Sequence, residues 1–440
     1  MQKLIKINQK LSPFKKVIKI EGDKSLSIRW ALIASQANGK STAKNLLKSE
    51  DVINTLKCLK KLGVKSKLIG NKCEIYGVGL NGFNYKKKII LNAGNSGTLA
   101  RLILGLLVHS GTTIKIIGDR SLSKRDFFRI IIPLKKFGAK FKTKDGKLPI
   151  NIKGTKHPKP IKYFENKGSA QCKSSVMLAA LNTKGQTQIK AKKSRNHTEL
   201  LFKYLNLPIK ILNNKKYDYL KIRGQRNIRP FNYNVPADIS SSAFFIILTT
   251  LISNSKLTIK SVNINPTRIG VIKILKMMNA NIKFKNIKIY KGEKIADIQV
   301  EGVKSLKGIN CPSNLNSAAI DEFLVIFLVA AKASGISTFK NLSELNQKES
   351  PRLKWGSKIL NLIGIKTITT RDSIKIYGNP NLKVNKKILI KDYLKDHRVF
   401  MTSVIASLAF GGKWTIHDRD SIKTSFPSFL KIINDIKKRQ

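Results

Sequence analysis

Leu59-Lys60-Lys61-Leu62-Gly63-Val64 is a stretch that recurs, in looser form, along the 440-residue chain. An apolar helical run ends at a glycine or asparagine, and an apolar residue follows directly. Because these two residues tolerate a left-handed backbone, each copy predicts a helix end that leads into a strand. The other copies lie roughly 70 to 85 residues apart: Leu134-Lys135-Lys136-Phe137-Gly138-Ala139, Tyr204-Leu205-Asn206-Leu207, Leu275-Lys276-Met277-Met278-Asn279-Ala280 and Leu360-Asn361-Leu362-Ile363-Gly364-Ile365.

Short β-branched runs between the copies indicate strands, as at 114–117, 187–190 and 257–260. A helical stretch at 427–438 lies where a sixth copy would end. Each unit reads as a few strands with two helices, which is too little to close a core alone. The sequence therefore predicts an α+β fold in which six units pack on one another.

Length and composition favour a folded protein of two or more domains, since 42% of the residues are apolar. The four cysteines are far apart, with no histidine at metal-ligand spacing, and are interpreted as reduced packing residues. The N-terminus lacks the apolar run of a signal peptide. The longest apolar runs, 243–252 and 323–331, are about half the ~20 residues of a membrane span. A cytoplasmic protein is expected.

The formal net charge of +60 raises an alternative, a non-catalytic protein that binds RNA or another polyanion. The lysines are spread along the whole chain and accompany many Ile and Asn residues, whose codons are also rich in A and T. Base composition is therefore a sufficient cause of the charge. The sequence contains no zinc-finger spacing, no basic region with heptads and no Gly-aromatic RNA-binding motif. No specific nucleic-acid partner is expected.

Seven clusters carry lysine or arginine, most of them in Gly- or Ser-rich turns. Free backbone N–H groups beside fixed positive charge suit small polyanions such as phosphates and carboxylates. The clusters are Gly22-Asp23-Lys24-Ser25-Leu26-Ser27-Ile28-Arg29, Gly94-Asn95-Ser96-Gly97-Thr98-Leu99-Ala100-Arg101, Ser121-Leu122-Ser123-Lys124-Arg125, Ser169-Ala170-Gln171-Cys172-Lys173, Lys348-Glu349-Ser350-Pro351-Arg352, Asp396-His397-Arg398 and Lys423-Thr424-Ser425-Phe426-Pro427.

Two carboxylates stand out in this acid-poor chain, Asp321 and Glu349. Glu349 lies between Lys348 and Arg352, where positive charge would adjust its proton affinity for acid/base work. Asp321 taken alone is equally well explained as a helix cap or a solvated helix start. Arginines such as Arg352 and Arg398 can hold carboxylate or phosphate oxygens as bidentate forks.

The ordered motifs resemble those of the 5-enolpyruvylshikimate-3-phosphate synthase family over nearly the whole chain, and its bacterial class II subgroup in particular. Besides the clusters, the resemblance rests on Gly118-Asp119 through Arg125, Ser194-Arg195-Asn196-His197-Thr198-Glu199 and Asn265-Pro266-Thr267-Arg268. It implies two domains of three β-α-β-α-β-β units each, with the active site in the cleft between them. The domains would comprise residues 1–21 with 238–440, and 22–237.

The resemblance also implies a reaction of the shikimate pathway, the step toward chorismate and the aromatic amino acids. The enolpyruvyl group of phosphoenolpyruvate moves to the 5-hydroxyl of shikimate 3-phosphate, through a tetrahedral intermediate and without metal or cofactor. Only these small molecules are expected as partners, with no membrane contact and a monomeric enzyme.

The same resemblance assigns roles to single residues. Asp321, Glu349 and Lys24 are the expected catalytic residues, with Asp321 at the attacking hydroxyl and Glu349 at the methylene carbon. Shikimate 3-phosphate is expected to contact Lys24, Ser25, Arg29, Ser169, Ala170, Gln171, Ser194, Asp321 and Lys348. Phosphoenolpyruvate is expected to contact Lys24, Asn95, Gly97, Arg125, Gln171, Arg352, Arg398 and Lys423.

Some positions depart from the family pattern. Asp126 follows Arg125 where proline is usual, and Asn346 and Pro351 flank Lys-Glu-Ser where Arg and Asp are common. Within the same fold, a UDP-N-acetylglucosamine enolpyruvyl transferase is the nearest alternative, but it would carry Asn after Lys24. The resemblance also implies that the enzyme is sensitive to glyphosate. Gly97 leaves room for this inhibitor, whereas the methyl group of an alanine at the same position would intrude on it.

Overall fold

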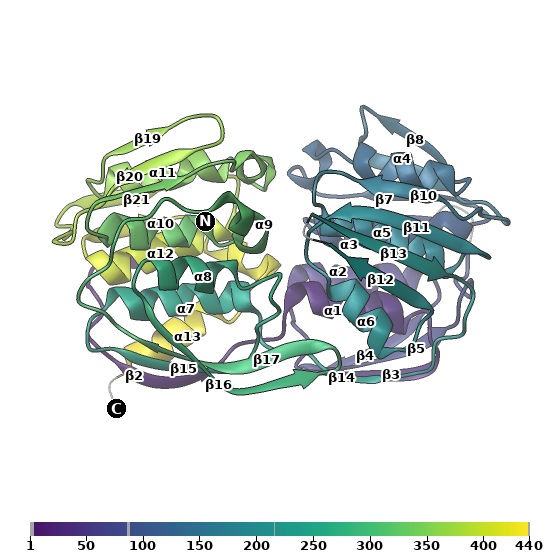
Figure 1. The fold of residues 1–440 in the computed structure, drawn as a ribbon, viewed down its shortest axis with the longest axis horizontal. Helices are drawn as coiled ribbons and strands as arrows, with labels where there is room; N and C mark the ends of the chain where they lie inside the picture. Colours follow the sequence, from purple (N-terminus) through teal and green to yellow (C-terminus); the bar gives the residue numbers. More distant parts are fainter. Residues whose placement is uncertain (1–3, 86–88, 215, 439–440) are drawn as a thin grey trace. The chain divides into compact units, whose positions relative to one another are not determined.

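The computed structural model describes residues 4–85, 89–214 and 216–438 (Figure 1). It divides the chain into two compact units. Unit 1 comprises the segment up to Glu21, Pro236–Ile289 and the segment from Lys294 onward; unit 2 comprises Gly22–Val235 and Tyr290–Glu293. The resemblance predicts two domains with a boundary after residue 237, and these bounds stay a prediction. Residues 1–3, 86–88, 215 and 439–440 of the predicted domains lie outside the described part of the chain.

Unit 2 contains three four-stranded sheets of one topology, ordered β14-β3-β5-β4, β6-β7-β9-β8 and β10-β11-β13-β12. In each sheet the first two strands are parallel and the remaining neighbours antiparallel. The strands are β3 Asn38–Lys44, β4 Lys65–Ile69, β5 Lys72–Val78, β6 Ile89–Asn92, β7 Thr113–Ile117, β8 Lys140–Lys144, β9 Lys147–Lys153, β10 Lys162–Glu165, β11 Gln186–Lys192, β12 Ile209–Asn213, β13 Tyr217–Arg223 and β14 Asn232–Asn234.

Two helices accompany each of these sheets, so the element order is β-α-β-α-β-β, with β14 returning late in the chain to complete the first sheet. The helices are α1 Lys24–Ala34, α2 Glu50–Lys61, α3 Gly97–Leu106, α4 Phe128–Lys136, α5 Ala170–Leu181 and α6 His197–Tyr204, with 3₁₀ turns η1 Leu107–His109 and η2 Leu122–Lys124.

Unit 1 contains three sheets ordered β16-β17-β15-β2, β18-β20-β19 and β1-β22-β21. The N-terminal strands join it, because β1 pairs with β22 and β2 pairs with β15. Its strands are β1 Ile5–Ile7, β2 Lys15–Lys19, β15 Lys256–Asn263, β16 Asn281–Tyr290, β17 Glu293–Glu301, β18 Ile336–Phe339, β19 Thr367–Thr369, β20 Ile374–Tyr377, β21 Lys387–Ile390 and β22 Lys413–Ile416. Its helices are α7 Ile239–Leu251, α8 Gly270–Met277, α9 Asn316–Ala319, α10 Phe323–Lys332, α11 Arg352–Leu362, α12 His397–Phe410 and α13 Phe429–Lys437, with 3₁₀ turns η3 Ser313–Leu315, η4 Ser343–Gln347 and η5 Arg419–Thr424.

The predicted helix ends are confirmed, because a residue with positive φ follows each of the five helices. The values are +88° at Gly63, +105° at Gly138, +52° at Asn206, +74° at Asn279 and +89° at Gly364. The expected sixth helix is also present, as α13, and the predicted runs at 114–117, 187–190 and 257–260 lie in β7, β11 and β15.

Within each unit, helices form the interior and one face of each sheet covers them (Figure 1). In unit 1, α7, α10 and α12 pack on one another, and every side chain of α7 is buried. In unit 2, α3 packs on both α1 and α5. The four cysteines are free and buried in these cores, as expected. Across the described residues, no helix combines the length and the apolar character needed to span a bilayer.

Candidate active site

The predicted site residues form clusters within each unit, and each unit is described by itself. In unit 1 they gather where two helices begin. The guanidinium of Arg352, the first residue of α11, donates from Nε to Asp396 Oδ2 at 2.9 Å and from Nη2 to Asp396 Oδ1 at 3.2 Å. Asp396 also caps α12 by accepting from the Arg398 N–H at 2.9 Å. The two helix starts are therefore joined by a bidentate ion pair.

This ion pair is almost completely buried, with Arg352 2% exposed and Asp396 0% exposed. Burial by itself would raise the pKa of Asp396, but the charge and hydrogen bond of Arg352, together with the charge of His397, outweigh it and hold that pKa below its usual range. Burial likewise opposes the charge on Arg352, and the carboxylates of Asp396 and Glu349 more than offset it, so its pKa is raised. Both groups therefore remain charged over the physiological pH range.

Asp321 lies beside this pair, in the turn before α10. Its Oδ1 accepts from Lys348 Nζ at 3.2 Å and lies 3.6 Å from Arg352 Nη1. The Arg398 Nη1 donates to the backbone carbonyl of Asp321 at 2.7 Å. The expected alternative role as a helix cap does not describe Asp321, because the residue that precedes α10 is Glu322.

Glu349 completes the unit 1 cluster, since its Oε2 accepts from Arg352 Nη2 at 2.5 Å. Its sequence neighbour Lys348 donates instead to Asp321. Unit 1 thus combines two carboxylates with a lysine and an arginine, and the charged atoms of each ion pair lie within 4 Å of each other. This arrangement can hold an anionic substrate and exchange protons with it.

Lys423 is also a predicted site residue of unit 1, but it takes no part in the ion pairs and hydrogen bonds described above for this cluster. It is exposed on η5. The Oγ1 of the adjacent Thr424 lies 3.3 Å from Nδ1 of His397. His397 directly precedes the predicted site residue Arg398 in the chain. The role expected for Lys423 stays a prediction.

In unit 2, Arg29 is buried on α1 and reaches two other helices. Its Nε donates to Thr198 Oγ1 on α6 at 2.9 Å, and its Nη2 donates to Ser174 Oγ on α5 at 3.2 Å. The two hydroxyls are 2.7 Å apart. The remaining amino group, Nη1, donates to the carbonyl of Ser25 at 3.2 Å, so the first turn of α1 and the guanidinium are held together.

A second group in unit 2 surrounds the start of α3. Gln171 accepts from Arg101 Nη1 at 2.7 Å and donates to Thr98 Oγ1 at 2.9 Å, which joins α5 to α3. Burial lowers the pKa of Arg101 to about 10, and the nearby charge of Arg125 acts in the same direction. Two positive side chains thus lie together at a helix N-terminus, an environment that favours an anion.

Asn95 and Gly97 lie at the same helix start. Arg125 Nη2 is 3.5 Å from Asn95 Oδ1, and Asn95 Nδ2 donates to Asp119 at 2.5 Å. A methyl group added at Gly97 would lie 2.8 Å from Arg101 Nη1 and 3.0 Å from Arg125 Nη1. An alanine here would require the terminal nitrogens of these two arginines to shift, because both guanidinium groups occupy that space.

The remaining predicted residues of unit 2 lie at helix starts or in the turn before α6. Lys24 opens α1 and forms an ion pair with Asp51 at 3.0 Å. Ser169 caps α5 by accepting from the Cys172 N–H at 3.3 Å, and Ala170 is the first residue of that helix. Ser194 is 7% exposed, and its Oγ has no hydrogen-bond partner among the described residues.

Sequence reasoning missed the residues that hold these side chains in place. Asp396, Asp51, Arg101, Ser174 and Thr198 contact predicted site residues, yet none was assigned a role. Four of the five lie inside or beside motifs already quoted, so proximity to a motif was the available signal. Asp51 had no such signal, since acidic residues are common in the first turn of a helix.

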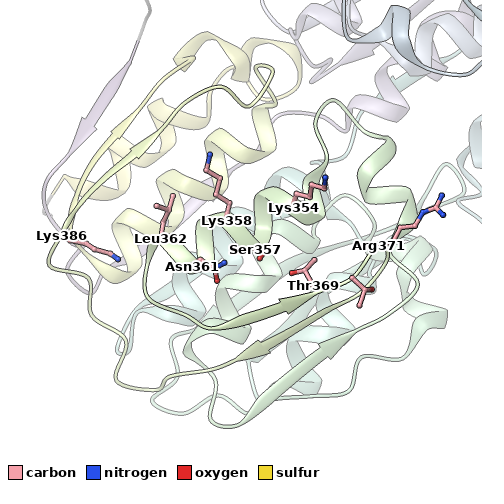
Figure 2. Close-up of a pocket in the computed structure, with 9 residues that line it drawn as sticks. Lys354, Ser357, Lys358, Asn361, Leu362, Thr369, Arg371 and Lys386 are labelled. Atoms are coloured by element: carbon pink, nitrogen blue, oxygen red, sulfur yellow. The ribbon is translucent and has the colours of Figure 1, made fainter.

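A surface pocket of about 920 Å³ lies in unit 1, on the exposed side of α11 (Figure 2). Lys354 and Lys358 lie on the helix beside it, and Arg371 lies on the loop after β19. None of the described residues that line it is a predicted site residue. Its lining therefore does not identify the active site, which rests on the side-chain clusters described above.

Comparison with known proteins decides the family. The family profile of EPSP synthase (3-phosphoshikimate 1-carboxyvinyltransferase) matches residues 8–433. The chain belongs to the EPSP synthase family. The 3-phosphoshikimate 1-carboxyvinyltransferase of Ruthia magnifica subsp. Calyptogena magnifica is 42% identical over 95% of this chain and 94% of its own. The enzyme of that name from Thermoanaerobacter sp. (strain X514) is 38% identical over 95% and 96%.

Solved structures agree with the EPSP synthase family. EPSP synthase from Acinetobacter baumannii superposes with a TM-score of 0.86 and 34% identity, covering 99% of this chain and 98% of that chain. The enolpyruvyl transferase NikO from Streptomyces tendae has a TM-score of 0.74 at 13% identity, covering 98% and 97%, and shares the fold alone. The resemblance read from the motifs and the predicted fold class are both confirmed.

Proposed function

We propose that this chain is a 3-phosphoshikimate 1-carboxyvinyltransferase, which transfers the enolpyruvyl group of phosphoenolpyruvate to the 5-hydroxyl of shikimate 3-phosphate and releases phosphate. The observation that carries the proposal is the cluster of Asp321, Lys348, Glu349 and Arg352, which places two carboxylates beside two cations. Membership of the EPSP synthase family supplies the reaction. The names of the relatives, which match over nearly their whole length, support the same substrates.

The cluster in unit 1 is proposed to carry the proton transfers. The hydroxyl oxygen of shikimate 3-phosphate bonds to C2 of phosphoenolpyruvate and gives up its proton toward Asp321, while Glu349 delivers a proton to the methylene carbon. In the second half, that carbon returns one proton to Glu349 as the bond between C2 and the phosphate oxygen breaks, so the double bond is restored. The departing phosphate takes up the proton that Asp321 received from the hydroxyl. Lys24 is proposed to assist as a cation. Holding two anions in reactive orientation is expected to supply much of the rate.

The remaining residues are proposed to bind substrates. Ser25, Arg29, Ser169, Ala170, Gln171, Ser194 and Lys348 are the proposed contacts of shikimate 3-phosphate. Asn95, Gly97, Arg125, Arg352, Arg398 and Lys423 are those of phosphoenolpyruvate. Because these sets include residues of both units, each unit alone is expected to lack turnover.

The test is phosphate release from phosphoenolpyruvate by the purified chain, with shikimate 3-phosphate, with UDP-N-acetylglucosamine, or with neither. Release that requires shikimate 3-phosphate and is lost in Glu349→Gln and Arg125→Ala is the expected result. Arg371→Ala is the matched control, because Arg371 lines the pocket beside α11 and is not a predicted site residue. Release only with the nucleotide sugar, or none with either acceptor, would contradict the proposal.

A further inference from the structure

The sheet β10-β11-β13-β12 has an open face that the proposed reaction does not use. Its other face is covered, since α5 packs against β11 and β13 and Ile189, Leu220 and Ile222 are buried there. On the open face the register places Phe164 beside Lys190, and Lys190 beside Tyr219. The neighbouring pair, Lys192 and Tyr217, extends this alternation of cations and rings along the two central strands.

Three aromatic rings form a cluster around Lys190 on this face. Phe164 and Tyr217 have ring centroids 5.7 Å apart, and Tyr217 and Tyr219 have centroids 6.5 Å apart. The Lys190 ammonium lies 5.1, 4.7 and 5.8 Å from the centroids of Phe164, Tyr217 and Tyr219. Phe164 and Tyr219 nevertheless remain 48% and 38% exposed. Such large rings are usually buried, so an exposed cluster indicates a ligand surface.

Positive charge surrounds the rings on the same face, and no acidic side chain of the described strands shares it. Asp218, between two of the aromatic residues, points to the covered side and is buried. The cations of this face are Lys162, Lys190, Lys192, Lys210, Lys221 and Arg223.

The chain's base composition accounts for lysines but not for this cluster of rings. The open face of the sheet β6-β7-β9-β8 has the same topology and also carries six lysines without an acid, yet its described strands place no aromatic residue there. If positive charge alone decided binding, the two faces would bind polyanions equally well. A ligand that also contains flat rings would bind more tightly to the face with the aromatic cluster.

We propose that the open face of β10-β11-β13-β12 binds single-stranded nucleic acid without sequence preference. Bases stack on Phe164, Tyr217 and Tyr219, and phosphates lie against the surrounding cations. Exposed aromatic rings within a basic groove or sheet face are the physical requirement for this kind of binding, because every base offers a flat face. In a duplex each base is stacked between neighbouring base pairs, which hides that face, so the surface prefers single strands. The inference is independent of the proposed function.

The test compares three triple variants of the full chain by fluorescence anisotropy with U12 and dT12 at 150 mM NaCl. Phe164→Leu/Tyr217→Leu/Tyr219→Leu removes the rings at constant charge. Lys192→Gln/Lys221→Gln/Arg223→Gln removes three charges from the same face. The control, Lys140→Gln/Lys142→Gln/Lys144→Gln, removes three charges from the β6-β7-β9-β8 sheet.

The ring variant is expected to bind both oligonucleotides at least about tenfold more weakly, since each stacked base contributes appreciably to affinity. Its dependence on salt should equal that of the unaltered chain. The charge variant should reduce the slope of log affinity against log salt by about 2, and the control by much less. Thermal melting should confirm that all three are folded.

Crosslinking of a 5-bromouridine oligonucleotide to the unaltered chain provides a test without mutations, and the expected adduct lies on Tyr217 or Tyr219. Several results would overturn the proposal: a ring variant within twofold of the unaltered chain, a 12-base-pair duplex bound as tightly as U12, or a control as impaired as the charge variant. Loss of binding to phosphatidylserine vesicles by the ring variant, with oligonucleotide binding unchanged, would assign the face to membranes and overturn it too.

Discussion

Gly97 is a residue at which one methyl group should alter substrate and inhibitor binding. The Cβ of alanine would lie within 3.0 Å of the terminal nitrogens of Arg101 and Arg125, so both guanidinium groups must move. We predict that Gly97→Ala raises the KM for phosphoenolpyruvate about fivefold, as expected for a cost of about 1 kcal/mol. We also predict weaker inhibition by glyphosate. Steady-state kinetics with and without the inhibitor measures both.

The control for this change is Gly111→Ala, because a Cβ at Gly111 has no atom within 4 Å. It should leave the KM and the inhibition constant unchanged. An inhibition constant for Gly97→Ala equal to that of the unaltered enzyme would contradict the prediction.

Thr198 is a positioning residue for Arg29. Thr198→Val keeps the shape of the side chain but removes the oxygen that accepts from Arg29 Nε and contacts Ser174. Hydrogen bonds to charged groups contribute about 1.5–3 kcal/mol, so we predict a KM for shikimate 3-phosphate raised roughly tenfold or more, with a much smaller change in kcat. Thr198→Ser should restore the KM. A variant that melts at lower temperature with an unchanged KM would assign Thr198 a purely structural role.

Helices α11 and α12 depend on the ion pair between Arg352 and Asp396. In Asp396→Asn the cap of α12 is retained, since asparagine caps as well as aspartate, while the buried charge of Arg352 loses its main partner. We predict a loss of about 3 kcal/mol in the free energy of unfolding at pH 7, measured by urea denaturation. Asp372→Asn, on an exposed loop, is the control and should change stability by less than about 0.5 kcal/mol.

The same pair makes stability depend on pH. Because the pKa of Asp396 is lowered in the folded chain, its carboxylate stabilises the fold at pH values above its unfolded pKa of about 4. That contribution is lost as the pH falls through the lower, folded pKa. The difference in stability between the unaltered chain and Asp396→Asn should therefore shrink on acidification from pH 5 toward pH 3. A difference that stays constant over this range would show that the charge of Asp396 is not its source.

The ends of helices were predictable because they depend on adjacent residues. A left-handed Gly or Asn after an apolar run acts locally, and Gly63 and Asn279 show it at +88° and +74°. The order of strands was not predictable in this way. β14 completes the sheet of β3 although almost 190 residues separate them, and no local pattern records such a pairing.

The cores of both units protect all four cysteines. Burial raises the pKa of the Cys58 and Cys73 thiols to about 12 and that of Cys311 to about 11, and it also raises the pKa of Cys172. Thiolates are the reactive form, so we predict almost no reaction with DTNB at pH 8 in the folded chain and four equivalents in 6 M guanidinium chloride. Rapid reaction of one thiol before unfolding would show that its unit opens locally.

The sequence by itself determined the repeated unit, the α+β class and the family, because these depend on local backbone preferences and on ordered motifs read along the chain. It also indicated the substrate-binding residues through those motifs, although their roles remain proposals. Only the tertiary structure decided that Lys348 contacts Asp321, that Asp396 holds Arg352, and that Lys190 lies among three rings. Arg29 and Thr198 make the reason plain: they are 169 residues apart in the chain, and only the folded arrangement of α1 and α6 in unit 2 brings their atoms to 2.9 Å.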